Sequence, residues 1–223
     1  MRTETGHRRG KGRSTIRTDR IEKTKQFLRE QLQSDIEDWG WQYRYEHSLR
    51  VAAVGKKIAE AEGFDAEHMV IGCLLHDVGY GICRSHEDHA NHGALSERVA
   101  RPFLMELVMD KKTVEAICYG ILTHTMPDDQ LLRPCTPFEA TIVDADNIDR
   151  FGPLRASHAH GQKELLKKRP DEIVSICDKV INGYTDYKAL PFGTKTAQGM
   201  WCEALDEEIR FYTRLKKQML DVV

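Results

Sequence analysis

Apolar residues recur at intervals of three and four along most of this chain, the spacing that places them on one face of an α-helix. No segment alternates apolar and polar residues over the length of a strand. The pattern therefore predicts an all-α protein. The predicted helical segments are residues 21–39, 43–63, 66–77, 92–109, 111–124, 136–149, 170–183 and 197–220.

Residues typical of helix ends stand at several borders of these segments. Gly63 is suited to a C-terminal cap, and Asp65 to the N-terminal cap of the next helix. Thr136 is followed by a proline and, three residues on, by Glu139, which is the pattern of a capping box. Pro102 lies inside a helical segment, where we expect it to break or kink the helix.

Four longer stretches lack helical periodicity, and we expect loops there: residues 79–91, 125–137, 150–160 and 183–196. No repeat or linker interrupts residues 20–223, so we predict one all-α domain with helices at its C-terminal end. Residues 1–19 are basic and nearly free of apolar side chains, which is typical of a disordered tail. Contact of this tail with RNA or an acidic partner is the alternative.

The overall composition fits a soluble globular protein. Hydrophobic residues make up 40% of the 223 residues, charged residues make up 30%, and the formal net charge is −2. This small net charge gives no reason to expect a nucleic-acid partner. Neither a secretory signal nor an apolar run long enough to span a bilayer is present, so we also expect no membrane partner. The six cysteines are scattered without a CxxC pair, which indicates reduced thiols in a cytoplasmic protein.

Several ionisable residues continue the apolar stripes of the predicted helices and therefore point toward the core. His47 stands four and seven residues before Val51 and Val54. His124 closes a stripe that contains Ile117 and Ile121 in the same way. The whole set, from five segments, is His47, His76, Asp77, His92, His124 and Asp144.

A metal ion is the partner that best explains this set. For any one of these residues a hydrogen-bonded core position is the ordinary explanation, but two core-facing carboxylates each carry a large desolvation cost. A divalent cation offsets that cost and takes neutral imidazoles as further ligands. Histidine and carboxylate ligands without thiolate favour Fe, Mn, Co, Ni or Zn over Ca or Mg. We therefore predict a divalent transition metal, as one or two ions.

His76 and Asp77 are adjacent, and adjacent side chains on a helix diverge by about 100°. They can share one site only near a helix end, and the glycines that follow them fit such an end. His86 and His89 lie in the expected loop before His92, and either of them could replace it as a ligand or contact a substrate.

The segments "EHSLRVA", "LLHDVG" and "IVDADNIDR" resemble the HD-domain superfamily of metal-dependent phosphohydrolases, over roughly residues 43–150. The resemblance implies an all-α helical bundle. It also implies that Asp77 bridges two ions and takes part in catalysis. By the same resemblance the primary metal ligands are His47, His76, Asp77 and Asp144, and the second metal takes His92 and His124.

The sequence also departs from the pattern of known members. Many phosphodiesterase members carry a phosphate-binding lysine four residues after the motif histidine, whereas Tyr80 occupies that position here. The GYP motif of cyclic-dinucleotide phosphodiesterases and the Glu-Asp pair of alarmone hydrolases are missing as well. "VDADNIDRFG" is similar to members that act on nucleotides, and the two-metal pattern is nearer to those that hydrolyse dinucleoside polyphosphates.

The resemblance thus implies a hydrolase in which metal-activated water attacks a small phosphate ester, most naturally a nucleotide. Arg50 and Arg150 are candidates for phosphate contacts, with surface ion pairs as the alternative, and Tyr80, His86 and His89 are further substrate-binding candidates. Two other functions use the same scaffold: a mixed-valent di-iron oxygenase and a regulatory or binding protein. A homodimer is a further expectation.

Overall fold

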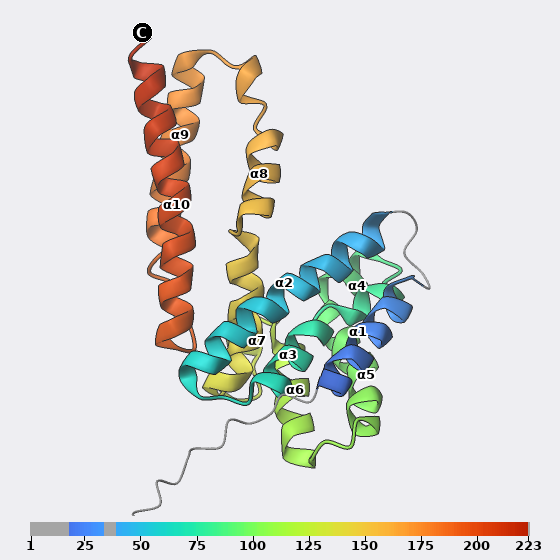
Figure 1. Ribbon diagram of the computed structural model, residues 1–223. Helices are drawn as coiled ribbons and strands as arrows, with labels where there is room; N and C mark the ends of the chain where they lie inside the picture. Colours follow the sequence, from blue (N-terminus) through green and yellow to red (C-terminus); the bar gives the residue numbers. More distant parts are fainter. Residues whose placement is uncertain (1–17, 34–38, 223) are drawn as a thin grey trace, which may run out of the picture.

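The computed structural model describes residues 18–33 and 39–222. The predicted basic tail, residues 1–19, lies outside the described residues except for Thr18 and Asp19, which begin the first helix. The helices are α1 (Thr18–Gln33), α2 (Trp39–Glu62), α3 (Ala66–Leu75), α4 (His86–Ala90), α5 (His92–Glu106), α6 (Lys111–Thr123), α7 (Pro137–Arg150), α8 (Pro153–Gln162), α9 (Pro170–Tyr187) and α10 (Lys195–Leu220). The described residues contain no strand, which confirms the all-α prediction (Figure 1).

The predicted helix ends are confirmed where the sequence offered a cap. Gly63 follows α2 with φ of 78°, a backbone conformation that costs a glycine little. Asp65 accepts a hydrogen bond from the backbone N–H of His68 at the start of α3. Thr136 and Glu139 form the expected capping box at the start of α7.

Two sequence predictions about local structure are wrong, and a third is wrong in part. α5 continues through Pro102 to Glu106, so the proline does not break the helix, while the expected kink stays a prediction. The stretch expected as a loop over residues 150–160 contains most of α8, which begins directly after Gly152 with a proline in its first turn. The stretch over residues 79–91 contains α4 and most of a short 3₁₀ helix, Val78–Ile82. Short polar helices of this kind lack the apolar stripe that a sequence pattern detects.

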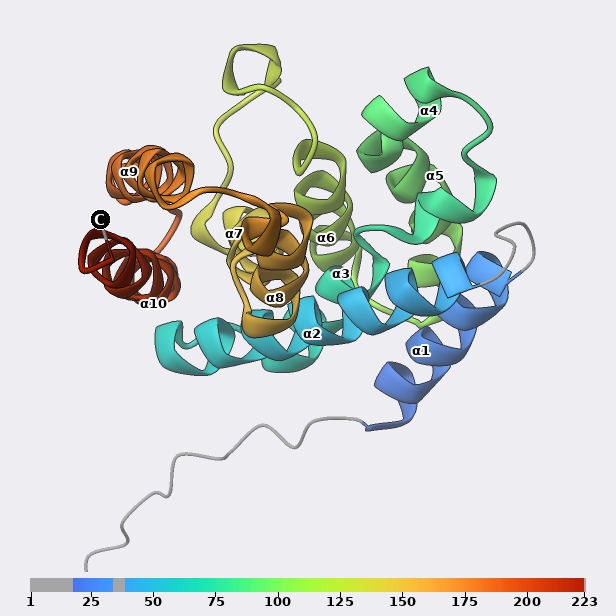
Figure 2. The ribbon, with the colours of Figure 1, turned by 90° about the horizontal axis from the view of Figure 1, so that it is seen from above.

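The core forms where α1, α2, α6 and α7 surround α3, and α5 packs against α6. α3 is apolar on nearly all sides, and residues from Met69 to Leu75 are buried along it, so it runs through the centre. α2 lies across both α3 and α7 (Figures 1 and 2). Ile117 of α6 and Ile142 of α7 are fully buried members of the same cluster. This arrangement brings the ends of four core helices toward one region.

The two C-terminal helices form an antiparallel pair that packs against the other side of α7 (Figure 1). Trp201 and Leu205 of α10 are buried in one cluster with Ile148 of α7 and Ile58 of α2. α7 is therefore buried on two faces, one toward α3 and one toward α10. The prediction that residues 20–223 form a single domain stays a prediction.

Among the described helices, none combines the length and the apolarity that a membrane span requires. All six cysteines are free thiols, and Cys73, Cys118 and Cys177 are buried. The cytoplasmic location and the homodimer remain predictions from the sequence.

Candidate metal centre

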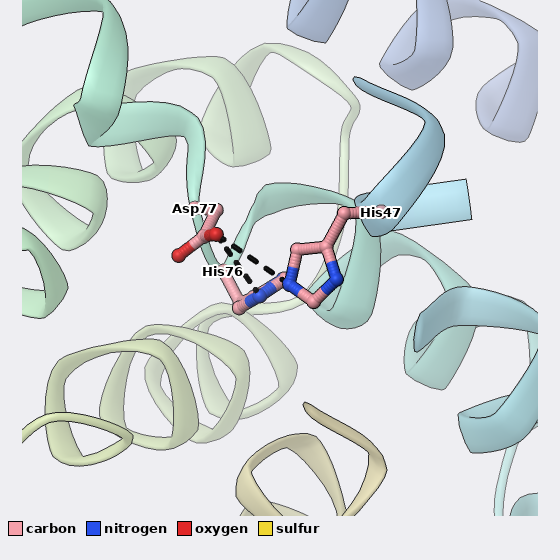
Figure 3. Close-up of side chains that lie close together, drawn as sticks. All are labelled: His47, His76 and Asp77. Atoms are coloured by element: carbon pink, nitrogen blue, oxygen red, sulfur yellow. Dashed lines mark ion pairs between the residues drawn. The ribbon is translucent and has the colours of Figure 1, made fainter. Parts of the chain in front are cut away.

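His76 and Asp77 stand at the C-terminal end of α3, where both side chains can turn toward one point. α3 ends at Leu75, and the backbone leaves the helix at Asp77, with φ of −105° and ψ of 9°. Oδ2 of Asp77 lies 3.6 Å from Nε2 of His76 and 3.6 Å from Nε2 of His47 (Figure 3). The helix end predicted from the sequence is therefore the feature that lets two adjacent residues share a site.

His47 comes from the middle of α2 and is held between two carboxylates of α7. Its Nδ1 lies 2.8 Å from Oδ2 of Asp149, and its Nε2 lies 3.2 Å from Oδ1 of Asp146. Nε2 of His76 is 3.9 Å from the same Asp146 oxygen. The side chains of His47, Asp146 and Asp149 are all at least nine-tenths buried, so these charges are largely out of water.

A second pair of histidines faces the other oxygen of Asp77. Nε2 of His92, at the start of α5, lies 3.2 Å from Oδ1 of Asp77. Nε2 of His124, directly after α6, lies 3.5 Å from that oxygen. Asp77 thus presents one oxygen to His47 and His76 and the other to His92 and His124, which is the arrangement of a bridging carboxylate.

A close contact between two backbones sets the position of α5. Gly79 donates its N–H to Oγ of Ser96, and a Cβ at Gly79 would come within 2.4 Å of the Ser96 nitrogen. Only glycine allows the chain after Asp77 to approach α5 this closely. The helix that carries His92 is thereby placed beside the end of α3.

All four histidines are anchored in the same way. Each Nδ1 lies within hydrogen-bond distance of an oxygen acceptor, so Nδ1 donates to that oxygen and Nε2 is the nitrogen that faces the centre as a ligand atom. The acceptors are a carboxylate for one ring and a backbone carbonyl for the other three. They are Asp149 for His47 at 2.8 Å, Cys73 for His76 at 2.7 Å, His89 for His92 at 2.7 Å and Ile121 for His124 at 2.6 Å.

Two observations test whether metal ions fit these donors. Nε2 of His76 is buried and has no hydrogen-bond partner among the described residues. Nε2 of His92 and Nε2 of His124 face each other at 3.0 Å, although the anchoring of Nδ1 leaves lone pairs on both. Cations at the two groups would accept the lone pairs of all three nitrogens. Imidazole nitrogen with carboxylate oxygen is a donor set that suits divalent transition metals. The donors therefore fit two ions that share Asp77.

The acidic groups around His47 also set its charge. Burial lowers the pKa of His47, but the hydrogen bonds to Asp146 and Asp149 outweigh burial and raise that pKa to about 9. Burial dominates at His76 and lowers its pKa to about 4. Burial works against ionisation of Asp77, yet the surrounding histidines hold its pKa well below the usual range. Burial likewise opposes ionisation of Asp146, but the hydrogen bond to His47 holds its pKa well below the usual range, so the centre contains two ionised carboxylates, Asp77 and Asp146, which favours a bound cation.

The structure brings Asp146, rather than the predicted Asp144, to this cluster. Positions two residues apart on a helix differ by about 200°, so the two side chains leave α7 on nearly opposite sides. Asp144 instead accepts a hydrogen bond from the backbone N–H of Gly193 at 2.9 Å. The sequence assignment placed the core on the face that carries Ala140 and Ile148, but α7 is buried on two faces, and that face packs against α10.

A cavity of about 250 Å³ opens onto the centre and is lined by cationic side chains. His47, Asp77, His92 and Asp146 line it together with Tyr80 and the guanidinium groups of Arg44, Arg150 and Arg155. Nη1 of Arg44 lies 3.1 Å from Oδ2 of Asp77, and its guanidinium carbon lies 3.7 Å from the centroid of the Tyr80 ring. We refer to this space as the arginine cavity.

A larger cavity of about 1110 Å³ adjoins the arginine cavity. The two share Arg44, Tyr80, Arg150 and Arg155 as lining residues. The larger one adds Tyr43, His89 and His158, with small and apolar residues of α8. We refer to it as the outer cavity.

The predicted substrate-binding residues divide into two groups. Arg150 and Tyr80 line both cavities, and His89 lines the outer one. Arg150 also donates a hydrogen bond to Oδ2 of Asp146 at 3.0 Å. By contrast, Arg50 donates to the carboxylate of Asp149 behind His47 and lines neither cavity, and His86 is exposed at the start of α4 and lines neither cavity.

Four residues of this region were missed in the sequence. Asp146 and Asp149 share one face of α7 at a spacing of three, and that spacing was the available signal. Arg44 lies one turn before His47 on α2, so its nearness to a predicted ligand was visible too. Arg155 gave no signal, because the sequence pattern did not predict α8.

Comparisons with known proteins give one family and one related structure. The sequence profile of the HD domain matches residues 44–183. The crystal structure of a predicted HD superfamily hydrolase from an uncultured Thermotogales bacterium superposes with a TM-score of 0.62 at 18% identity, over 89% of this chain and 92% of the other. A search of curated proteins found no match.

Proposed function

Because this chain belongs to the HD-domain family, we propose that it is a metal-dependent phosphohydrolase that acts on a small phosphate ester of the nucleotide class. One observation carries the proposal: four of the six residues that fit metal ions, His47, Asp77, His92 and Asp146, line a cavity together with three arginines. Anionic substrate groups are the natural occupants of such a cavity.

The ligand set would consist of His47, His76, Asp77 and Asp146 for one ion and Asp77, His92 and His124 for the other. Ions of this kind polarise a phosphoryl oxygen and lower the pKa of a bound water toward neutrality. Asp77 would hold both ions at a fixed separation, since its two oxygens face different histidine pairs.

The arginines would bind and orient the phosphate. Arg44 is held over the ring of Tyr80 and hydrogen-bonded to Asp77, so its guanidinium is already placed at the mouth of the centre. Arg150 is fixed by Asp146 at the same mouth, and Arg155 borders it from α8. Guanidinium groups suit bidentate contacts with phosphate oxygens, and their preorganisation limits the ordering cost of binding. Tyr80, which replaces the lysine of many phosphodiesterase members, would thus act through Arg44.

The sizes of the two cavities support a substrate with a bulky leaving group. The arginine cavity, at about 250 Å³, suits a phosphoryl group, whereas the outer cavity, at about 1110 Å³, has the size of sites for drug-sized ligands. Tyr43 and Tyr80 offer aromatic surface to a base or sugar in the outer cavity. A nucleoside phosphate fits this division.

The test is phosphate release from a panel of nucleoside monophosphates, dinucleoside polyphosphates and simple phosphomonoesters. The metal-free protein would be loaded with Mn, Co or Fe and assayed in air and under anaerobic conditions. We expect phosphate release that needs metal and does not need oxygen. The Asp77→Ala variant should lose this activity, whereas Asp178→Ala, which removes an exposed aspartate of α9, should keep it.

The same assay separates the other functions of this scaffold. Turnover that needs oxygen and releases no phosphate would identify a di-iron oxygenase and overturn the proposal. Binding of nucleotides without turnover under any metal would identify a regulatory or binding protein and would overturn it equally.

A further inference from the structure

A third cavity, of about 790 Å³, lies along a different face of α7. Ala140, Val143, Asp144 and Asn147 form its α7 wall. Segments 131–135 and 190–193 enclose it from two other sides. Among the described residues, none that lines this cavity also lines the arginine cavity or the outer cavity. We call it the Asp144 cavity.

The carboxylate of Asp144 has an incomplete set of hydrogen-bond partners among the described residues. Only 6% of the residue is exposed, and Oδ2 accepts the N–H of Gly193 at 2.9 Å. In the described part of the chain the carboxylate forms no ion pair. Arg133 also lines the cavity, but its guanidinium donates to both oxygens of Glu139 at 2.8 and 2.7 Å. A buried carboxylate with one hydrogen bond calls for another donor.

The position of Asp144 is fixed by a close approach between the chain and α7. A Cβ at Gly193 would come within 2.5 Å of Cβ of Ala140, so only glycine fits there. This contact holds the Gly193 N–H on the carboxylate and leaves the other oxygen, Oδ1, free to take a ligand's hydrogen bond. The acceptor is thus preformed.

The remaining walls suit a flat apolar ring. Phe192 and Trp201 line the cavity with ring centroids 5.0 Å apart and an interplanar angle of 33°. The indole N–H of Trp201 donates to the carbonyl of Tyr187 at 2.8 Å, so the ring is held in place. Asn147 lies three residues after Asp144 and adds an amide on the same wall. Aromatic walls with a few convergent polar groups are typical of small-molecule sites.

We propose that the Asp144 cavity binds a small aromatic or heteroaromatic molecule that presents an amidine or amino group to Asp144. A donor of this kind supplies the partner that the carboxylate lacks, and a cationic amidine also offsets its charge. His124 lines the same cavity while its Nε2 faces Asp77, so a ligand there would rest against a residue of the metal centre. This site does not depend on the proposed phosphohydrolase activity.

The test is calorimetric titration of the full metal-loaded chain with benzamidine and adenine. The matched probes are benzamide, which carries a neutral amide in place of the cationic amidine, and hypoxanthine, which carries a carbonyl in place of the amino group of adenine. We expect benzamidine and adenine to bind and their carbonyl counterparts to bind more weakly. Asp144→Asn should weaken benzamidine binding about tenfold or more, because a charge-assisted hydrogen bond is lost.

Three further variants make the result decisive. Glu203→Gln, on the exposed side of α10, and Arg155→Ala, in the arginine cavity, should both bind benzamidine like the unchanged protein. Val143→Phe should weaken binding by filling the cavity, and it serves as the test if Asp144→Asn does not fold. The proposal would be overturned if Asp144→Asn and Val143→Phe bound benzamidine as tightly as the unchanged protein, if Arg155→Ala lost binding, or if neither benzamidine nor adenine bound.

Discussion

The carboxylate of Asp149 lies 2.8 Å from Nδ1 of His47, so that α7 holds the imidazole ring of α2 from behind while its Nε2 faces the metal centre. Arg50 donates to both oxygens of the same carboxylate, at 2.9 and 3.2 Å. The orientation and basicity of a candidate ligand therefore depend on a residue that would not itself touch a metal.

Replacing Asp149 should weaken metal binding without removing a ligand. Asp149→Asn keeps the shape of the side chain but loses the charge that stabilises His47 and pairs with Arg50. We expect metal affinity to fall about tenfold to hundredfold, the range found for such outer contacts. Competition with a chelator measures the change. Asp178→Asn, at an exposed ion pair, is the control, and equal affinities in the two variants would contradict the role of Asp149.

Replacement of Asp146 should lower the metal content of the protein, whereas replacement of Asp144 should not. Asp146→Asn removes a carboxylate oxygen that lies 3.2 Å from Nε2 of His47, so its metal content should fall further than that of Asp149→Asn. Asp144→Asn, whose side chain bonds Gly193, should keep full metal content. Elemental analysis of the purified variants measures both. If Asp144→Asn lost metal and Asp146→Asn kept its full metal content, Asp144 would be the ligand, as the sequence predicted.

The second histidine pair should control the number of ions. His92 and His124 face only the Oδ1 side of Asp77, so replacing either by Gln should remove one ion and leave the other. We expect metal content per chain to fall from two to one. Anomalous scattering or elemental analysis provides the count. One ion in the unchanged protein, or no ion in the His92→Gln variant, would refute separate sites.

His47 and His76 should contribute to the stability of the metal-free chain with opposite dependence on pH, and Asp144, whose pKa burial raises to about 7, should offset the His76 contribution below pH 7. Protonated His47 is favoured in the folded state, with a pKa of about 9 against 6.5 when unfolded, so its contribution is full below pH 6.5 and is lost as the pH rises through 9. His76 has the opposite shift, to about 4, so its contribution falls as the pH drops from 6.5 toward 4. Thermal melts across this range test both slopes.

Metal should reverse the alkaline slope. An ion that uses Nε2 of His47 must displace its proton, so binding tightens with rising pH and the metal-induced increase in melting temperature should grow between pH 6 and 9. His47→Gln should reduce the alkaline slope of the metal-free chain, to which His124 also contributes, whereas His68→Gln, outside the cluster, should keep it. A flat metal-free profile above pH 6.5 would count against this charge assignment.

Replacement of Arg44 should lower kcat/KM for the substrate without lowering the metal content. Arg44→Ala removes a guanidinium from the mouth of the centre, and we expect kcat/KM for phosphate esters to fall about tenfold to hundredfold. Metal content should not fall, because the arginine competes with metal for Oδ2 of Asp77. Arg98→Ala, at an exposed position of α5, is the control. Unchanged kcat/KM with saturating metal would exclude the phosphate contact.

Most of the fold was visible in the sequence because long helices with one buried face carry a strong periodic signal. The caps at Gly63, Asp65 and Thr136 are local features of a few residues, so they were predictable as well. α4 and α8 were not, since each is short and has no buried residue. A helix without an apolar stripe shows no periodic pattern of apolar residues by which the sequence could reveal it.

The same reasoning explains the outcome at the candidate site. The periodicity of apolar residues correctly predicted that five side chains face the centre. Four of them lie on or at the end of apolar stripes, namely His47, His76, His92 and His124, and Asp77 follows a helix end. Asp144 was placed wrongly because a helix buried on two faces gives no preferred side. Arg44 and Arg155 meet only in three dimensions, from α2 and α8, so no local pattern joins them.

The two buried faces of α7 limit the insertions and deletions that this helix can tolerate during evolution. One face carries Asp146 and Asp149, and the other carries Asp144 and Ile148. Insertion or deletion of one residue within residues 139–149 would rotate everything beyond it by about 100° and disturb both faces at once. Length variation in this chain should therefore collect in the connections, such as residues 124–136, while the length of α7 stays fixed.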